Sequence, residues 1–238
     1  MQAQAATKAA AKIDLAGLAA CQGLAQRART HIAAIGSVQR VDQGTTLFSE
    51  GDRAEYVYEV VSGMLRLYKA LPDGRRQITG FLSAGHHLGL SLNDLYLYSA
   101  EAITEVNLRR YPRAWFERLV DEVPGLARRL LAATSDELRA AQDQMLLLGR
   151  KTAGERIASF LIMLSDQHSN VRGADKVHVP MSRSDIADYL GLTMETVSRM
   201  LAKLKQIGAI ALSTPARISL LDRGQLEDLA AGELEPAL

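Results

Sequence analysis

The chain is poor in the residues that build metal clusters, disulfide frameworks and membrane anchors. Its 238 residues include one cysteine, Cys21, which excludes an intramolecular disulfide and cannot by itself hold a four-cysteine iron–sulfur cluster or structural zinc. No run approaches the ~18 apolar residues of a membrane span. Lys8, Lys12 and Asp14 interrupt the alanine-rich start, which therefore lacks the apolar core of a signal peptide. We expect a cytoplasmic protein without a membrane partner.

An excess of one charge sign is also missing. The chain has 28 Lys and Arg residues against 27 Asp and Glu residues, a formal net charge of +1. Any affinity for nucleic acid would therefore depend on where basic groups are placed and on the presentation of two copies.

Enzymatic motifs are lacking too. The sequence contains no G-x-S-x-G, P-loop or Rossmann glycine pattern. A cupin-type metal oxidase would need an H-x-H pair, a carboxylate and a later histidine, whereas His86 and His87 are adjacent and the next histidine is His168. We expect neither an enzyme nor a metal site.

A helix-turn-helix pattern is present at residues 181–210. Ser182 and Asp185 form an S-x-x-D capping pattern for a first helix, which Gly191 ends by accepting a positive φ. Thr193 is the expected N-cap of a second helix that runs to about Gly208. Apolar residues at helical spacing predict the buried face of this helix: Val197, Met200, Leu201, Leu204 and Ile207.

The opposite face of the second helix carries residues suited to reading DNA bases. Glu195, Ser198 and Arg199 share a face with Ala202 near the helix N-terminus, the part that recognition helices present to the major groove. Glutamate can accept a hydrogen bond from cytosine N4, and arginine can donate two to guanine. The alternative is an ordinary exposed ion pair between Glu195 and Arg199.

The periodicity of apolar residues and the distribution of glycines divide the whole chain into four regions. Short β-type runs separated by glycines over 38–112 predict an antiparallel barrel or jelly roll, in which Pro72, Asp73 and Gly74 form a hairpin turn. Residues 1–37 are a lead-in, 113–150 are helical, and 151–238 complete a winged helix with a hairpin at 209–221. The order of the acidic tail, 225–238, stays open.

The helical region contains an apolar seam that follows alternating steps of three and four residues. Such a heptad spacing favours a parallel homodimer, although the stripe could also pack on its own domain. Two recognition helices would then lie about one DNA turn apart on a palindromic site. The seam residues are Leu131, Thr134, Leu138, Ala141, Met145 and Leu148.

Taken together, these motifs resemble the Crp/Fnr superfamily of bacterial regulators, and most of all its Fnr/FixK branch. The segments that carry the resemblance are QGTTLFSEGD at 43–52, RRQITGF at 75–81, QMLLLGRKTAGERIASFL at 144–161 and MSRSDIADYLGLTMETVSR at 181–199. The resemblance implies an α+β fold with an N-terminal antiparallel β-roll, a long dimerisation helix and a C-terminal winged helix-turn-helix.

The resemblance also implies partners: double-stranded DNA, a second copy of the chain and RNA polymerase, with activation as the outcome. Glu195, Ser198 and Arg199 match positions that read TTGA-containing half-sites in the Fnr type. The expected contacts to the DNA backbone are Arg183, Thr193, Thr196 and Lys203, each of which could instead be a cap, a core-edge hydroxyl or a solvated charge.

Departures from the family pattern bear on control. Leu90 and Tyr98 stand where the nucleotide-binding branch has a ribose-binding glutamate and a phosphate-binding arginine, so we expect no cyclic nucleotide. Arg109 stands where oxygen sensors carry a late cysteine, which argues against an iron–sulfur cluster. Ala141 stands where oxygen-switched relatives carry an acid that opposes pairing. We therefore expect a dimer that forms without a cofactor.

Control could then lie in synthesis, turnover or oxidation of Cys21, which is the candidate redox residue. The sequence shows neither exposure nor a basic setting for this thiol, so we expect it to be inert. The alternative is a small ligand in the roll, such as haem held by His86 or His87. We expect these two loop histidines to be solvated instead.

Overall fold

A computed structural model describes residues 36–90, 94–168, 176–214 and 216–233. These residues fall into two compact units, whose boundary lies between Ser135 and Asp136, inside helix α4 (Pro124–Arg150). Cys21 and the lead-in lie outside the described residues. No helix in the described ranges is long and apolar enough to cross a membrane.

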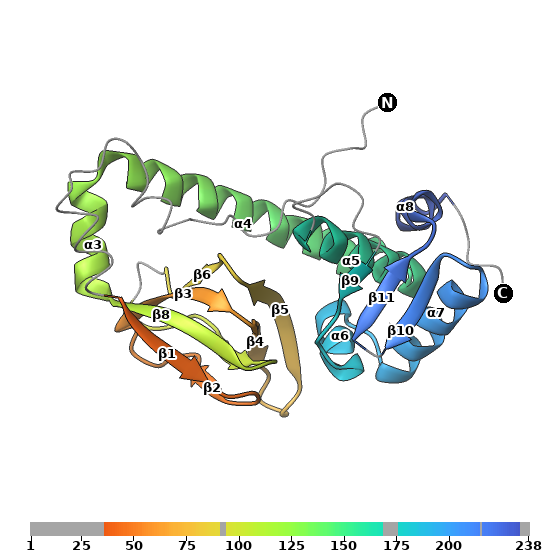
Figure 1. Cartoon of the computed structure of the whole chain (residues 1–238), viewed down its shortest axis with the longest axis horizontal. Coiled ribbons are helices and arrows are strands. Elements are labelled where there is room, and N and C mark those ends of the chain that lie inside the picture. Colours follow the sequence, from red (N-terminus) through yellow and green to blue (C-terminus); the bar gives the residue numbers. More distant parts are fainter. Residues whose placement is uncertain (1–35, 91–93, 169–175, 215, 234–238) are drawn as a thin grey trace. The chain divides into compact units, whose positions relative to one another are not determined.

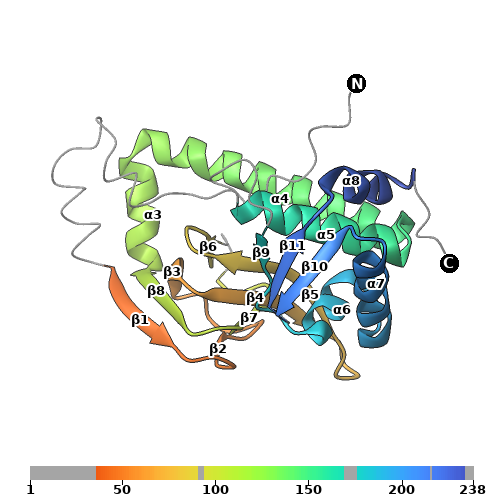
Figure 2. The same cartoon turned by 45° about the vertical axis from the view of Figure 1, so that its right-hand side comes forward.

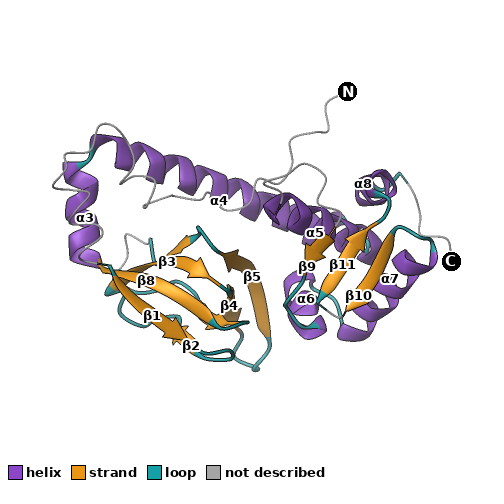
Figure 3. Ribbon diagram, in the orientation of Figure 1, coloured by secondary structure: helices purple, strands orange, loops and turns teal. Residues whose placement is uncertain are grey.

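The first unit contains a β-roll of two four-stranded antiparallel sheets (Figures 1 and 3). One sheet has the order β1-β8-β3-β6 and the other β2-β7-β4-β5. The strands are β1 (Ser37–Val41), β2 (Thr46–Phe48), β3 (Tyr56–Ser62), β4 (Met64–Ala70), β5 (Arg76–Ser83), β6 (His87–Leu88), β7 (Ser99–Ala102) and β8 (Val106–Pro112).

The predicted hairpin joins β4 to β5. Gly74 has a φ of 86°, and the turn closes through hydrogen bonds between Leu71 and Arg75 and from Gly74 N–H to Leu71 O. Alternating residues of β3 separate two apolar clusters, since successive side chains of a strand point to opposite faces. Tyr58 and Val60 join the cluster between the sheets, whereas Val57 joins a second cluster with helices α3 (Arg113–Glu122) and α4.

The helical region that follows the roll is two helices, α3 (Arg113–Glu122) and α4 (Pro124–Arg150), rather than one. Val123, with φ −117° and ψ 92°, is extended. A residue before proline is disfavoured in the helical conformation, so Pro124 ends α3 and begins α4. Phe116 and Trp115 pack beside Tyr111 of β8, where the roll meets these helices.

The second unit contains the C-terminal half of α4 and a winged helix. Its further elements are α5 (Ala153–His168), β9 (Lys176–His178), α6 (Arg183–Leu190), α7 (Met194–Gln206), β10 (Ile210–Thr214), β11 (Arg217–Leu220) and α8 (Arg223–Ala231). The strands form an antiparallel sheet in the order β10-β11-β9, and α8 packs on α5 (Figure 2). The expected α+β fold, with a roll and a winged helix-turn-helix, is confirmed.

Candidate nucleic-acid interface

Helix α6 begins and ends at the residues that the sequence predicted. The Ser182 hydroxyl accepts a hydrogen bond from Asp185 N–H at 3.1 Å, and the Asp185 carboxylate accepts one from Ser182 N–H at 3.0 Å. This capping box satisfies two backbone donors that the helix itself leaves free. Gly191 follows in the left-handed conformation with a φ of 62°, and its N–H donates to Ala187 O.

Helix α7 is capped by Thr193, whose hydroxyl accepts a hydrogen bond from Thr196 N–H at 3.2 Å. Four of the five residues predicted for its buried face are buried: Val197, Met200, Leu201 and Leu204. The prediction was wrong for Ile207, which is 37% exposed. The helix ends at Gln206, so Ile207 is a C-cap residue and no longer follows the helical face.

The predicted base-reading residues lie together on the outside of α7. Glu195, Ser198, Arg199 and Ala202 are all exposed. They come from the first two to three turns of a helix whose other face is anchored in the core, so their directions are fixed by the fold. Within the described residues, Glu195 and Arg199 form no salt bridge with each other. The arrangement offers a carboxylate, a hydroxyl and a guanidinium to one partner surface.

Glu195 is held in its charged form. The pKa of its carboxyl lies below the ordinary value because the carboxylate accepts hydrogen bonds from its own backbone N–H and from the Thr193 hydroxyl. Acidic residues are also favoured in the first turn of a helix, where the backbone N–H groups point outward. At neutral pH the side chain is therefore a hydrogen-bond acceptor.

The four candidates for contacts to the DNA backbone differ in their surroundings. Thr193 is exposed and Thr196 is half-buried, and their hydroxyl oxygens lie 3.1 Å apart. Lys203 is half-buried on α7. Arg183, in the first turn of α6, is also half-buried, and its burial lowers the pKa of the guanidinium. The structure assigns Thr193 a capping role in addition to any role toward a ligand.

The wing is a three-stranded sheet, of which the sequence predicted two strands. β10 and β11 form the expected hairpin, and β9 pairs with β11 through Val177 and Ile218. β9 is only three residues long, and its partner lies about 40 positions later in the chain. A strand this short gives no periodic signal by itself.

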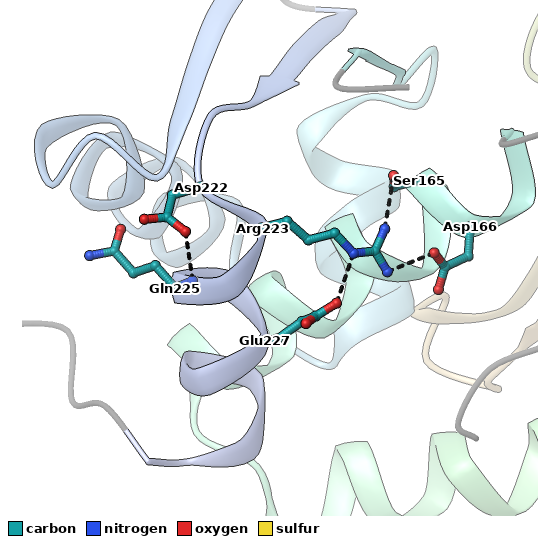
Figure 4. Close-up of polar contacts among 6 residues, drawn as sticks. All are labelled: Ser165, Asp166, Asp222, Arg223, Gln225 and Glu227. Atoms are coloured by element: carbon teal, nitrogen blue, oxygen red, sulfur yellow. Dashed lines mark hydrogen bonds and ion pairs between the residues drawn. The ribbon is translucent and has the colours of Figure 1, made fainter. Parts of the chain in front are cut away.

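Part of the acidic tail forms helix α8, which is held on α5 by Arg223 (Figure 4). The Arg223 guanidinium donates to Asp166 at 2.8 Å and Glu227 at 2.7 Å, with Ser165 Oγ at 3.5 Å. Asp222 caps the helix by accepting from Gln225 N–H at 2.9 Å. None of the residues in Figure 4 belongs to α6 or α7.

Most of the predicted dimer seam is exposed along α4. Leu131, Leu138 and Met145 expose 70%, 60% and 71% of their surface. Thr134 and Ala141 are also exposed, whereas Leu148 is half-buried. Within the described residues, five of the six seam positions thus leave their apolar or small side chains uncovered, on one stripe of the helix.

Aromatic rings pack together inside the roll, close to the segment that contains Gly89 and Tyr98. The Tyr98 hydroxyl accepts a hydrogen bond from Gly89 N–H at 3.2 Å. Phe48 stacks on Tyr96 with ring centroids 3.7 Å apart, and the rings of Tyr58 and Tyr98 each lie 5.9 Å from Phe48. Burial raises the pKa values of Tyr58 and Tyr96, so these phenols stay neutral.

Leu90 and Arg109, two further positions that depart from the family pattern, have structural partners. Leu90 packs against the apolar cluster of α3 and α4 rather than the cluster between the sheets. Arg109 donates to Glu59 at 2.9 Å, and Glu59 also accepts from the Tyr111 hydroxyl at 3.2 Å. Both side chains therefore take part in packing of the roll.

The expectation that both loop histidines are solvated was wrong for His86. This residue is 1% exposed, and its Nδ1 lies 2.8 Å from Ser83 O in the turn before β6. His87 is half-buried at the start of β6. The turn folds the first imidazole back onto its own backbone, which a sequence pattern does not reveal. No group of three or more potential metal ligands occurs within the described ranges.

Comparison with known proteins places both domains in described families. Residues 155–229 match the Crp-like helix-turn-helix domain, and residues 38–123 match the cyclic nucleotide-binding domain. The nitrogen fixation regulation protein FixK of Bradyrhizobium diazoefficiens is 48% identical over 189 residues, which cover 79% of each chain. The transcriptional activatory protein AadR of Rhodopseudomonas palustris is 40% identical over 216 residues, or 90% of each chain.

A solved structure shares the same fold. The structure of FixK2 from Bradyrhizobium japonicum matches with a TM-score of 0.78 and 42% sequence identity. The match covers 82% of this chain and 97% of that one, so it includes the roll, the long helix and the winged helix together.

Proposed function

The chain belongs to the Crp/Fnr family of transcription regulators, in its FixK-like branch, and from that premise we propose that it binds TTGA-type palindromes as a homodimer without an added ligand. The chain is a transcriptional activator of the FixK/Fnr type with a helix-turn-helix DNA-binding domain. Its relatives are regulators rather than enzymes.

The observation that carries the proposal is the exposed face of α7. Glu195, Ser198 and Arg199 present an acceptor, a hydroxyl and a forked donor from the N-terminal part of a helix anchored by four buried apolar residues. Arginine recognises guanine through O6 and N7, and glutamate recognises the amino group of cytosine. In a TTGA half-site the G·C pair offers both partners. Arg183, Thr193, Thr196 and Lys203 would position the complex through phosphates.

The exposed seam of α4 supports a dimer of identical chains. A second copy is the occupant that fits, because a heptad stripe is complementary to itself when two helices run parallel around a two-fold axis. Leu131, Leu138 and Met145 would cover one another, and Ala141 brings no charge to the interface. The same axis relates the two halves of a palindrome.

The interior of the roll supports ligand independence. The Tyr98 hydroxyl accepts a hydrogen bond from Gly89 N–H. Tyr98 also has an uncharged ring at a position where an arginine would be needed to neutralise a cyclic phosphate. Leu90 is committed to the apolar cluster of α3 and α4. A chain packed in this way would reach its DNA-binding form without a cofactor. RNA polymerase would be a further partner, in the cytoplasm where the DNA lies.

The second candidate function keeps the DNA reader but places a haem or a small metabolite in the roll. His86 is 1% exposed, so a haem could reach its imidazole only if the roll opened beside it. Absorbance above ~350 nm in freshly purified protein would support the alternative, because haem absorbs there and the bare chain does not.

The test of the proposal uses the full chain without added ligand. We expect a dimer by sedimentation and a dissociation constant of about 10⁻⁸ M or tighter for a TTGA palindrome by fluorescence anisotropy. A duplex with scrambled half-sites should bind at least about 10³-fold more weakly. A monomer that needs a ligand, or equal affinity for both duplexes, would overturn the proposal.

A further inference from the structure

Arg156, the fourth residue of α5, donates hydrogen bonds to the ends of two other helices. Its Nη2 donates to Leu148 O at 2.9 Å, in the last turn of α4, and its Nε donates to Lys151 O at 2.9 Å, just beyond that helix. Its Nη1 donates to Leu190 O at 2.8 Å, the last residue of α6, with Gly191 O at 3.3 Å. One guanidinium thus connects the C-termini of α4 and α6.

The chemistry of helix ends explains why an arginine lies there. The last four carbonyl groups of a helix lack partners within it, and the end carries a partial negative charge. Two such ends converge on Arg156, which supplies one positive charge and donors in several fixed directions. A lysine has the charge but lacks the planar fork, so it could not satisfy both ends at once.

Two further contacts bring α4 and α6 together. Gln144 Nε2 donates to Tyr189 O at 2.8 Å, which is a second link from α4 to the last turn of α6. A Cβ atom built on Gly191 would lie 3.3 Å from Leu148 Cδ2 and 3.5 Å from Arg156 Nη1. Gly191 therefore serves the positive φ and also the close approach of α4.

We propose that Arg156, assisted by Gln144, is a positioning residue that fixes the direction of recognition helix α7 relative to dimer helix α4. This inference rests on the proposed function. All of the contacts lie in the compact unit that contains the C-terminal half of α4 and the winged helix. Helix α7 begins at Met194, three residues after Gly191, so whatever fixes the end of α6 also fixes the start of α7.

The expected consequence is a narrow choice of half-site spacing. In a dimer held by α4, the angle between α4 and α7 sets the distance and rotation between the two recognition helices. One added base pair rotates the second half-site by about 35° around the DNA axis. If the connection between α4 and α7 is rigid, the second recognition helix cannot follow that rotation and affinity falls. If the connection is flexible, the helix can follow and affinity is largely kept. Base preference within a half-site depends on Glu195, Ser198 and Arg199 and would not change.

The experiment measures the affinity of the full-length dimer for palindromes whose central spacer is shortened or lengthened by single base pairs. We expect wild-type affinity to fall steeply on both sides of one best spacer. In Arg156→Ala, the ratio of the affinity for the best spacer to the affinity for the neighbouring spacers should fall about tenfold. The loss of one charge-assisted hydrogen bond changes an equilibrium constant by about that factor. Preference for TTGA over point-substituted half-sites should remain.

The matched control is Arg223→Ala, which removes another arginine that donates to three partners in the same unit but joins α5 to α8 (Figure 4). Its spacer profile should match wild type. An Arg156→Ala profile as narrow as that of wild type overturns the inference, and a control profile as broad as that of Arg156→Ala does the same.

Two further variants keep the inference testable if Arg156→Ala does not fold. Arg156→Lys retains the charge and should still broaden the profile, because one ammonium cannot reach both helix ends. Gln144→Ala removes the second link and should broaden it about threefold, as expected for one neutral hydrogen bond. Narrow profiles in both variants overturn the inference. Failure of wild type to bind any TTGA palindrome would instead refute the proposed function.

Discussion

At the scale of single residues, Arg199 is the side chain with the most specific expected task. Replacing it with alanine should weaken binding to the TTGA palindrome by about 1–3 kcal/mol per contact and relax the preference at the guanine position. Anisotropy with duplexes that vary one base pair at a time measures both effects.

Lys205→Ala is the control for Arg199→Ala, because Lys205 is another exposed cation of α7 but lies near the helix C-terminus. Lys205→Ala should weaken binding to every DNA sequence by about the same factor, and that factor should be smaller than the one for Arg199→Ala. This is the effect of losing a general electrostatic attraction to the phosphates. Unchanged base preference in Arg199→Ala would show that this arginine is only a solvated charge.

Glu195 gives a pH prediction. The pKa of its carboxyl is lowered from 4.5 by hydrogen bonds from its own N–H and from the Thr193 hydroxyl. The contribution of these bonds to the stability of the fold is therefore present above the unfolded pKa. It is lost only as pH falls through the lower folded pKa. The ratio of affinities for cytosine and other bases at its contact should therefore stay constant from about pH 8 to about pH 5.5.

Glu195→Gln serves as the reference for that measurement, because the amide has no charge to lose and the variant reports on every other titrating group. A wild-type ratio that declines over this range, while the ratio for the glutamine variant does not, would contradict the assigned protonation state.

At the scale of elements, helix α4 has an apolar stripe that the described part of its own chain leaves exposed. Leu138→Glu should weaken dimerisation by about 3 kcal/mol or more, because two carboxylates would face each other across a desolvated seam. Sedimentation equilibrium should show monomers at concentrations where wild type is dimeric, and affinity for the palindrome should fall in parallel.

Ala132→Glu introduces the same charge at another exposed position of α4, roughly a third of a turn around the helix from Leu138. This variant should remain a dimer. Equal loss in both variants would mean that general repulsion, rather than the seam, governs assembly.

Element boundaries with a local cause could be predicted from sequence, and those with a distant cause could not. Ser182, Asp185 and Gly191 define α6 through contacts within three or four residues, so their spacing is readable. β7, with the sequence SAEA, becomes a strand because β2 and β4 pair with it on both sides. The extended residue before Pro124 has a local cause, but the heptad pattern that continues through α4 obscured it.

At the scale of the whole molecule, the roll and the winged helix are separate compact units on one continuous helix. If the roll needs no ligand, cyclic AMP at about 1 mM should leave both the melting temperature and the affinity for the palindrome unchanged. A ligand that binds only the native state would raise the melting temperature by mass action, so the thermal scan is a direct test.

A positive control for that scan comes from the roll itself. Tyr98→Phe keeps the aromatic ring but removes the hydroxyl that accepts from Gly89 N–H, which should lower the free energy of unfolding by about 1–3 kcal/mol. Base preference should be unaffected. A rise in wild-type melting temperature with cyclic AMP would contradict the role proposed for Tyr98.

Spacing along the sequence was enough to predict the exposed face of α7 that carries Glu195, Ser198 and Arg199, the caps of α6 and α7, the hairpin between β4 and β5 and the family. These features depend on spacing within a few residues, where helical and strand periods act directly. The folded chain was needed to show that His86 is buried, that Ile207 leaves the helical face, that the Tyr98 hydroxyl accepts from Gly89 N–H, and that Arg156 joins the ends of α4 and α6. Each of these depends on partners brought close by folding, and whether a polar group is satisfied depends on that neighbourhood rather than on its place in the chain.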